Sequence, residues 1–254
     1  MCTVTAQLQE GRLVVTMNRD EFRSRAPETP PKLPGEAADA IYPIDTQAGG
    51  TWIGVNRHGV CACLTNQYLG SEVDIGESEP VGAGKSRGMI IPEVLEAGCW
   101  QEVANTVKSI DPTDFSPFNL MVFAIGKPWV EFDWPGQGEL SAREVGPDRF
   151  MLTSSSWNTD SVMAWRRQKY EEWLLAPRYL GTLPTFHLLQ PRDMEEWAPL
   201  MSREKTHTRS ITQVEVDNEK KEIHVRHWPE PTPSTDSPKT VLSMDLNTET
   251  VWEI

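Results

Sequence analysis

Hydrophobic and polar residues alternate along two short segments at the start of the chain, residues 3–9 and 12–18. Alternation with a period of two is typical of a strand that buries one face. Glu10 and Gly11 separate the two segments, so the pattern predicts a β-hairpin. A second hairpin is predicted over residues 51–56 and 60–65, which a short turn connects.

Segments with helical spacing and further strands follow. Helices are predicted over residues 86–97, 101–110, 160–175 and 192–201. The first of these begins at Ser86, and Pro92 either bends it or marks its real start. Strands are predicted over residues 119–125, 129–134, 139–145, 150–153, 211–216, 222–227, 240–245 and 250–254. Loops are predicted over residues 23–34 and 70–84.

The order of these elements is strands, helices, strands, helices and strands. Such blocks favour an α+β fold of stacked sheet and helix layers over an alternating parallel fold. No internal repeat or domain linker stands out, and we interpret the proline-rich residues 229–238 as a surface loop. We therefore predict a single domain over residues 1–254.

Composition excludes several partners. The 254 residues are 38% hydrophobic and 24% charged, which is typical of a globular chain that can bury a sizeable core. The net charge of −13 argues against nucleic acid and anionic membranes, because phosphate groups require clustered lysine and arginine. No apolar segment approaches the roughly eighteen residues of a membrane span, and no secretory signal is recognisable.

The cysteines indicate free thiols. Cys2, Cys61, Cys63 and Cys99 do not suggest a disulfide framework in a chain of this length. Cys61 and Cys63 would share one face of a strand. With His58 nearby a zinc site is conceivable, but the spacing is a weak signal and buried strand thiols are favoured. We expect a reducing, cytoplasmic environment.

Cys2 is the strongest candidate for chemistry. If Met1 is removed, Cys2 carries a nucleophilic sulfur and an α-amine on the same carbon. Their pKa values are nearly matched, so the amine can take the thiol proton. This pairing predicts an N-terminal nucleophile. The alternative interpretation is a small hydrophobic residue at a frayed chain end.

The segment Asn18-Arg19-Asp20-Glu21 ends the second strand of the first hairpin. Pairing through the turn at residues 10–11 places residue 2 opposite residues 18–20. A guanidinium there would lower the pKa of the Cys2 thiol, and a carboxylate would orient its amine. Alternatively, Arg19 and Asp20 form only a weak ion pair in a solvated turn.

Several further motifs lie along the chain. Together they are Met1-Cys2-Thr3, Asn18-Arg19-Asp20-Glu21, Gly49-Gly50-Thr51-Trp52-Ile53-Gly54-Val55-Asn56, Leu64-Thr65-Asn66, Ser86-Arg87-Gly88, Phe118-Asn119-Leu120 and Thr208-Arg209-Ser210-Ile211-Thr212. In this combination they resemble the NRDE family, also named the transport and Golgi organisation protein 2 family. That family in turn resembles the N-terminal nucleophile hydrolases that include penicillin V acylase and bile-salt hydrolase.

The resemblance implies a four-layer αββα sandwich and cleavage of a non-peptide amide bond. It assigns the nucleophile to Cys2, the carboxylate that holds its amine to Asp20, and the side-chain donor of an oxyanion hole to Asn66. Arg209 matches an arginine of a late strand that faces the nucleophile. Arg19 would supply positive charge near the sulfur or a substrate carboxylate.

Two positions depart from the hydrolase pattern. The hydrolases carry their early arginine where this chain has Met17, whereas here the arginine is Arg19. They also carry an asparagine where this chain has a run of threonine and serine, which we align at Ser154. A serine hydroxyl donates a hydrogen bond but reaches less far than an amide.

Other residues carry weaker signals. His187, His207, His224 and His227 lack metal-ligand spacing, and His207 alone is expected near the site. The tryptophans are predicted to fill the core or line a pocket. Gly82-Ala83-Gly84-Lys85-Ser86 lacks the leading glycine and preceding strand of a phosphate loop.

Two functions remain open at the level of sequence. The first is a cytoplasmic hydrolase with an N-terminal cysteine nucleophile that acts on a small-molecule substrate and needs no cofactor. The second is a non-catalytic carrier of haem, lipid or acyl-CoA on the same fold, in which the Cys2 thiolate could ligate haem iron. The sequence predicts no oligomeric state.

Overall fold

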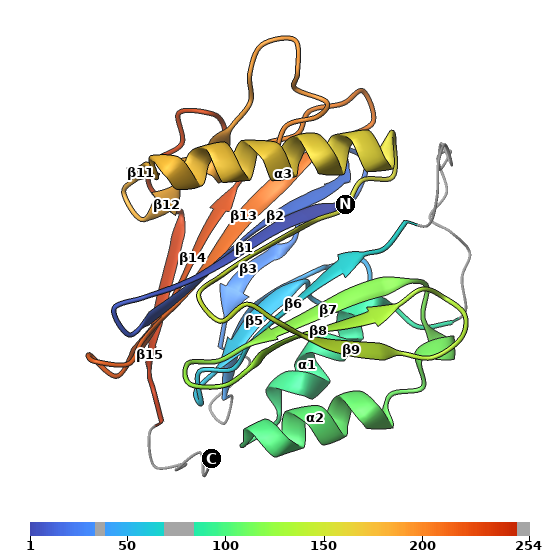
Figure 1. Ribbon diagram of the computed structural model, residues 1–254, viewed down its shortest axis with the longest axis vertical. Coiled ribbons are helices and arrows are strands. Elements are labelled where there is room, and N and C mark those ends of the chain that lie inside the picture. The colour runs from blue at the N-terminus through green and yellow to red at the C-terminus, as the bar shows by residue number, and fades with distance from the viewer. Residues whose placement is uncertain (34–38, 69–83, 248–254) are drawn as a thin grey trace.

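Two antiparallel sheets pack face to face in the computed structural model, and helices cover both outer faces (Figure 1). The structure describes residues 1–33, 39–68 and 84–247. The layers follow the order α, β, β, α. The predicted α+β fold with mostly antiparallel sheets is therefore confirmed.

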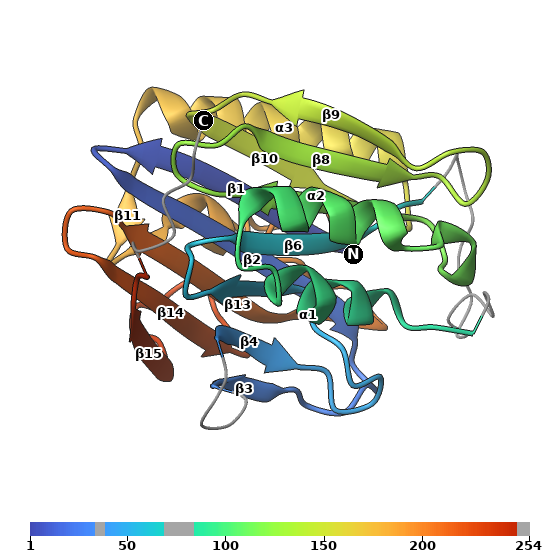
Figure 2. The ribbon, with the colours of Figure 1, turned by 90° about the horizontal axis from the view of Figure 1, so that it is seen from below.

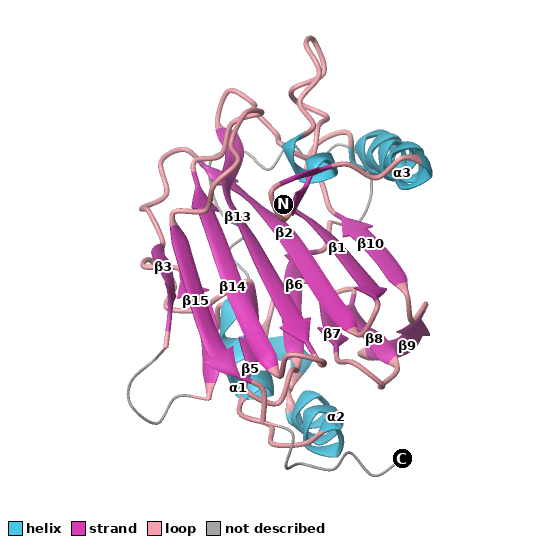
Figure 3. Ribbon diagram, turned by 90° about the vertical axis from the view of Figure 1, so that its left-hand side faces the viewer, coloured by secondary structure: helices cyan, strands magenta, loops and turns pink. Residues whose placement is uncertain are grey.

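The first sheet has six strands in the order β10–β1–β2–β13–β14–β15 (Figure 3). Their bounds are β1 Cys2–Gln9, β2 Arg12–Phe22, β10 Arg149–Thr153, β13 Thr206–Asp217, β14 Glu222–Pro229 and β15 Thr240–Asp245. β1 and β2 form the predicted hairpin, and its register pairs Cys2 with Arg19. The predicted proximity of residue 2 to residues 18–20 is thus confirmed. β13 pairs with the other edge of β2 and has a bulge between Thr208 and Ser210.

The second sheet has seven strands in the order β3–β4–β5–β6–β7–β8–β9. Their bounds are β3 Thr29–Lys32, β4 Ala40–Ile44, β5 Ile53–Asn56, β6 Cys61–Asn66, β7 Phe118–Phe123, β8 Trp129–Trp134 and β9 Ser141–Val145. β5 and β6 form the second predicted hairpin. Tyr179–Leu180 (β11) and Leu183–Pro184 (β12) make a separate two-stranded ribbon.

One long helix covers the first sheet and two short helices cover the second (Figures 1 and 2). The long helix is α3 (Thr159–Leu175), and the short ones are α1 (Ile90–Leu95) and α2 (Trp100–Ser109). Single 3₁₀ turns lie at Arg87–Met89, Pro112–Asp114 and Thr185–Leu188. In the described part of the chain, no helix has the length and apolar character to cross a membrane.

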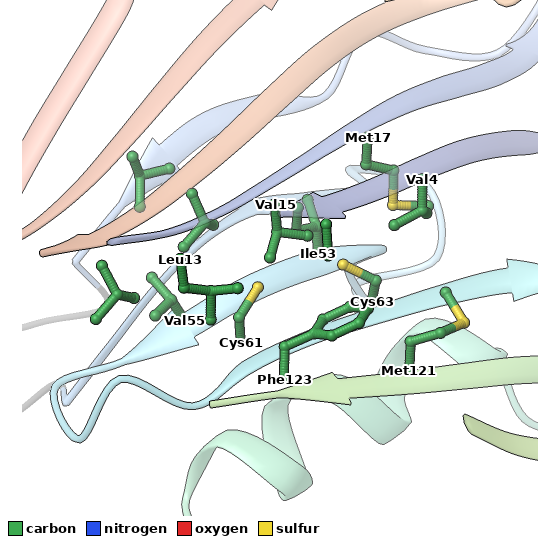
Figure 4. Close-up of a cluster of buried hydrophobic side chains, with 14 of the residues drawn as sticks. Val4, Leu13, Val15, Met17, Ile53, Val55, Cys61, Cys63, Met121 and Phe123 are labelled. Atoms are coloured by element: carbon green, nitrogen blue, oxygen red, sulfur yellow. The ribbon is translucent and has the colours of Figure 1, made fainter. Parts of the chain in front are cut away.

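The core between the sheets is apolar (Figure 4). Val4 and Val15 of the first sheet lie across from Val55 and Phe123 of the second, and all four are fully buried. Cys61 and Cys63 are free thiols in this core, as the favoured interpretation of their spacing predicted. Their inward orientation follows from the alternation of a strand.

Two predicted elements are wrong. Residues 192–201 form hydrogen-bonded turns instead of a helix, such as the one closed by the Trp197 and Met194 backbones. Within the predicted loop of residues 23–34, Thr29–Lys32 forms strand β3. The predicted helix at 86–97 is shorter, because its α-helical part begins at Ile90, close to Pro92. The predicted strand at 250–254 and most of the loop at 70–84 lie outside the described residues.

Candidate active site

A cavity of about 660 Å³ opens where β1 begins and where β2 and β6 end. Its volume is typical of a site for a small molecule. The wall includes Cys2, Arg19, Asp20 and Asn66. The fold therefore brings four of the five residues predicted from the sequence to one cavity, although they come from three separate strands.

Cys2 is held by the last residue of β10 and the residue that follows it. Its backbone N–H donates to Ser154 Oγ at 3.2 Å, and its carbonyl accepts from the Ser154 N–H at 3.0 Å and from Thr153 Oγ1 at 3.3 Å. The residue is 7% exposed. Burial raises the pKa of the Cys2 thiol, while the N-terminal ammonium acts in the opposite direction. Ser154, the departure from the hydrolase pattern, thus contacts the nitrogen that removal of Met1 would turn into an amine.

Asp20 lies on the opposite face of the hairpin from the Cys2 side chain. Its Oδ1 accepts a hydrogen bond from Thr208 Oγ1 at 2.7 Å. Its Oδ2 lies 3.7 Å from Arg166 Nη1 and, among the described residues, accepts no hydrogen bond. Burial raises the pKa of Asp20, and the Arg166 cation opposes that rise. A buried carboxylate oxygen without a donor is suited to an additional cationic partner.

Asn66 is the last residue of β6, and its side chain reaches the cavity from the second sheet. Its Nδ2 donates to the Tyr68 hydroxyl at 3.1 Å. The side-chain amide is half-buried. It therefore offers a neutral donor at the cavity wall, next to a phenol that the sequence analysis did not select.

Met1 occupies part of the same cavity. Its ammonium donates to the Asp20 carbonyl and to the Tyr68 hydroxyl, both at 3.4 Å. Its side chain lies against Arg203 and Ser156, with Sδ 3.0 Å from Arg203 Nη1 and 3.2 Å from Ser156 Oγ. Burial disfavours the ammonium, but the surrounding Tyr68, Cys2 and Asp20 outweigh burial and raise its pKa to about 10.

Arg19 is embedded in carboxylates. Its guanidinium lies 2.8 Å from Asp45 Oδ2 and 3.4 Å from an oxygen of each of Glu21 and Glu28. The guanidinium also stacks over the Trp52 ring at 4.4 Å from the centroid. Its positive charge is thus largely balanced before any ligand binds.

Arg209 takes a different place from the one the resemblance implied. In the described part of the chain it does not line the cavity. It lies at the bulge of β13, where its guanidinium pairs with Glu230 at 3.2 Å and with Glu28 at 3.8 Å. Burial alone would raise the pKa of Glu28, but the neighbouring His227 and Ser210 and the Arg19 cation lower it to about 2. Glu28 therefore connects Arg209 to Arg19.

His207 also lies outside the cavity lining and pairs with Glu230 at 2.9 Å. Sequence reasoning missed Arg166, Arg203 and Tyr68. A signal for Arg166 existed, because it lies four residues from both Val162 and Tyr170, on the buried stripe of α3. Within the described ranges, no cluster of three or more metal-ligating side chains occurs.

Comparison with known proteins identifies the family. The profile described as "Transport and Golgi organisation 2" matches residues 1–250. The chain belongs to this family. None of the curated proteins matches the sequence.

Solved structures similar to this family member include an N-acylethanolamine-hydrolyzing acid amidase ortholog from Caenorhabditis elegans. It is 16% identical, covers 84% of this chain and 92% of its own, and has a TM-score of 0.53. Two variants of conjugated bile acid hydrolase from Clostridium perfringens are 12% identical, cover 98% of this chain and 93% of their own, and have TM-scores of 0.47 and 0.48. The similarity to the amidase shows that this chain shares the amidase fold.

Proposed function

We propose that the protein is a hydrolase that uses Cys2 as an N-terminal nucleophile on a non-peptide amide or related acyl bond. One observation carries the proposal. A thiol, a carboxylate and a side-chain amide, from Cys2, Asp20 and Asn66, line a single cavity. Acyl transfer requires such a nucleophile, an orienting group and an oxyanion donor in reach of one carbonyl. The fold shared with an amide-hydrolysing amidase supports this choice.

The mechanism requires cleavage of the Met1–Cys2 bond. The Cys2 nitrogen then becomes an amine, with Ser154 Oγ at 3.2 Å and the Asp20 carboxylate as a further partner. This amine takes the proton of the Cys2 thiol, and Sγ attacks the substrate carbonyl carbon. The tetrahedral oxyanion accepts hydrogen bonds from Asn66 Nδ2 and from a backbone amide.

The intermediate collapses when the carbon–nitrogen bond of the substrate breaks. The Cys2 ammonium gives its proton to the leaving nitrogen, which departs as an amine and leaves a thioester on Sγ. Water then attacks the thioester, the carbon–sulfur bond breaks, and the acid leaves while the proton returns to the sulfur. In this scheme Arg19 supplies positive charge near Sγ. Arg209 acts as a positioning residue, because it holds Glu28 against Arg19.

The proposal places the reaction on a small-molecule substrate in a reducing, cytoplasmic environment. The four cysteines are free thiols, which is consistent with such an environment. A nucleophilic thiol also needs this environment to stay reduced.

A second candidate, the carrier, is favoured by one observation. With Met1 in place, the Cys2 nitrogen is an amide that cannot act as a base, and Met1 fills part of the cavity. A protein that retains Met1 would bind a lipid or acyl-CoA without turnover. Haem fits less well, because a ligating thiolate is needed and burial raises the pKa of the Cys2 thiol.

The deciding experiment combines intact-protein mass spectrometry with turnover of an acyl-amide library. Loss of Met1 and turnover that Cys2→Ala reduces by about a thousandfold or more support the hydrolase. Cys2→Ser should retain only a small part of the activity, because a hydroxyl is the weaker nucleophile.

Cys99→Ala is the matched control, since Cys99 precedes α2 away from the cavity. It should leave turnover unchanged. Retention of Met1, or equal turnover by wild type and Cys2→Ala, would refute the hydrolase and leave the carrier.

A further inference from the structure

The side chain of Met1 fills a polar recess of the cavity. Met1 is 8% exposed, and its Sδ is contacted by Arg203 Nη1 and Ser156 Oγ. A thioether is a weak acceptor. A guanidinium and a hydroxyl that point at it are therefore matched to a stronger acceptor than the one they contact.

Arg203 is fixed from its other sides. Its Nε donates to the Glu196 carbonyl at 2.9 Å, and its Nη2 donates to Ser155 Oγ at 3.1 Å. The guanidinium stacks over the Trp157 ring at 5.0 Å from the centroid. These contacts hold the Nη1 edge toward the recess without help from Met1, so the recess is preorganised for a ligand.

Arg203, which is half-buried, differs in its charge balance from Arg19, another arginine of the wall. Arg19 has three carboxylate partners. Arg203, within residues 1–33, 39–68 and 84–247, forms no ion pair. Burial lowers the pKa of Arg203, and the nearby Asp20 only partly opposes this. An anion in the recess would restore the electrostatic stabilisation that burial removes.

We infer that the recess held by Met1 is a subsite for a substrate carboxylate, with Arg203 as the residue that selects it. The inference rests on the proposed function, since the recess empties only when Met1 leaves. Met1 connects the two groups, because its Sδ contacts Arg203 Nη1 and its carbonyl carbon is bonded to the Cys2 nitrogen, so a carboxylate in the recess would lie near the scissile bond. The substrate class is therefore an N-acyl amino acid, with Trp157 as an apolar wall beside the guanidinium.

The test measures binding instead of turnover. The protein carries Cys2→Ala and is released from an N-terminal fusion cleaved directly before residue 2, so the recess is empty whatever happens to Met1 in a cell. Titration calorimetry compares N-octanoylglycine with N-octanoylethanolamine, which differ in the carboxylate. The glycine conjugate should bind at least about tenfold tighter.

Arg203→Gln should remove that preference by weakening N-octanoylglycine about tenfold while changing N-octanoylethanolamine by less than about twofold. Arg203→Lys should retain part of the preference, because it keeps the charge but not the guanidinium geometry. Arg23→Gln is the matched control. Arg23 holds the Arg203 carbonyl and Ser202 Oγ from outside the cavity lining, so it tests for a loop effect.

Equal affinity for the two compounds, failure of both to bind, or an equal loss of both in Arg203→Gln would overturn the subsite. None of these results depends on whether Cys2 is a nucleophile. Conversely, a carboxylate preference that disappears in Arg203→Gln supports the subsite even if wild type has no turnover.

Discussion

The β1–β2 hairpin buries both of its faces, but the two faces use different chemistry. The face toward the second sheet carries apolar side chains such as Val4 and Met17. The face under α3 carries Thr3, Thr5 and Asn18, which are buried to the same degree. Equal burial therefore does not imply equal composition. What differs is whether the covering layer supplies hydrogen-bond partners.

The covering layer supplies them mainly through Arg166, whose side chain is fully buried. Its Nη1 donates to Thr3 Oγ1 and Thr153 Oγ1 at 3.1 and 3.0 Å. Its Nε and Nη2 donate to the Trp197 and Ala198 carbonyls, both at 2.8 Å. A buried charge is tolerated when it is hydrogen-bonded in this way.

The candidate site lies where the two faces meet. The side chain of Cys2 belongs to the apolar face and that of Asp20 to the polar face. The main-chain nitrogen of Cys2 lies between them, in contact with Ser154. Strand alternation thus keeps thiol and carboxylate apart, and the atom proposed as the base is the one both faces can reach.

The largest effect is expected from removing Arg166, the cation that covers the polar face of the hairpin. Arg166→Met should lower the free energy of unfolding by about 3–5 kcal/mol, because it leaves the buried Asp20 carboxylate without its cation and removes a donor from two buried hydroxyls. Urea denaturation measures this. Adding Asp20→Asn should recover part of the loss. The exposed neighbour Arg167→Met is the control. A decrease of less than about 1 kcal/mol in the free energy of unfolding would mean that the polar face does not depend on Arg166.

Two near-isosteric substitutions at neighbouring residues compare the two faces of the hairpin directly. Val4→Thr places a hydroxyl in the apolar core, and Thr5→Val removes the hydroxyl that lies 2.7 Å from His187 Nε2. Each should cost about 1–3 kcal/mol of unfolding free energy, measured by denaturation. The same exchange at the exposed Val241 should cost less than about 0.5 kcal/mol. A Thr5→Val protein more stable than wild type would contradict the argument.

The smallest expected effect is the change of stability with pH that His187 produces. Burial lowers the pKa of His187 from 6.5 to about 3. Between these values the unfolded chain binds a proton that the native chain does not. Stability therefore falls as pH drops below 6.5, by up to about 1.4 kcal/mol per pH unit.

His187→Gln should remove this slope, which denaturation at pH 7 and pH 5 measures. His224→Gln, on the half-buried side of β14, should leave the slope as it is in wild type. An identical loss between the two pH values in wild type and His187→Gln would show that another group titrates.

The sequence was sufficient for the parts of the fold that alternation governs. Both hairpins and the opposition of Cys2 and Arg19 follow from short-range pairing. β3 was missed because its two prolines and flanking charges are loop signals, and only the sheet edge makes a strand possible there. The predicted helix at 192–201 failed because Pro191 and Pro199 frame backbone groups that hydrogen-bond to Arg166 and Asn18 instead.

The residues of the candidate site could also be predicted only in part. Cys2, Asp20 and Asn66 follow from motif and strand ends, and the structure gathers them, although their roles remain predictions. Arg203 lies in turns far along the chain, so only tertiary packing brings it to Met1. Arg166 lies on the buried stripe of α3, but a charged residue on a helix is ordinarily expected to face solvent, and that expectation outweighed its spacing.

The bulge in β13 sets the electrostatics of the site by a shift of one residue. Residues 210–217 pair with β2 in one register. The register shifts by one residue at the bulge, so that Thr208 pairs with Asp20. Had the register of residues 210–217 continued, Arg209 would pair with Asp20 in place of Thr208. The Asp20 carboxylate would then have a second cation beside it, in addition to Arg166. The extra residue instead places a neutral hydroxyl there and turns the arginine toward Glu28. A single inserted position thus decides which ionic pairs the two faces of the sheet contain.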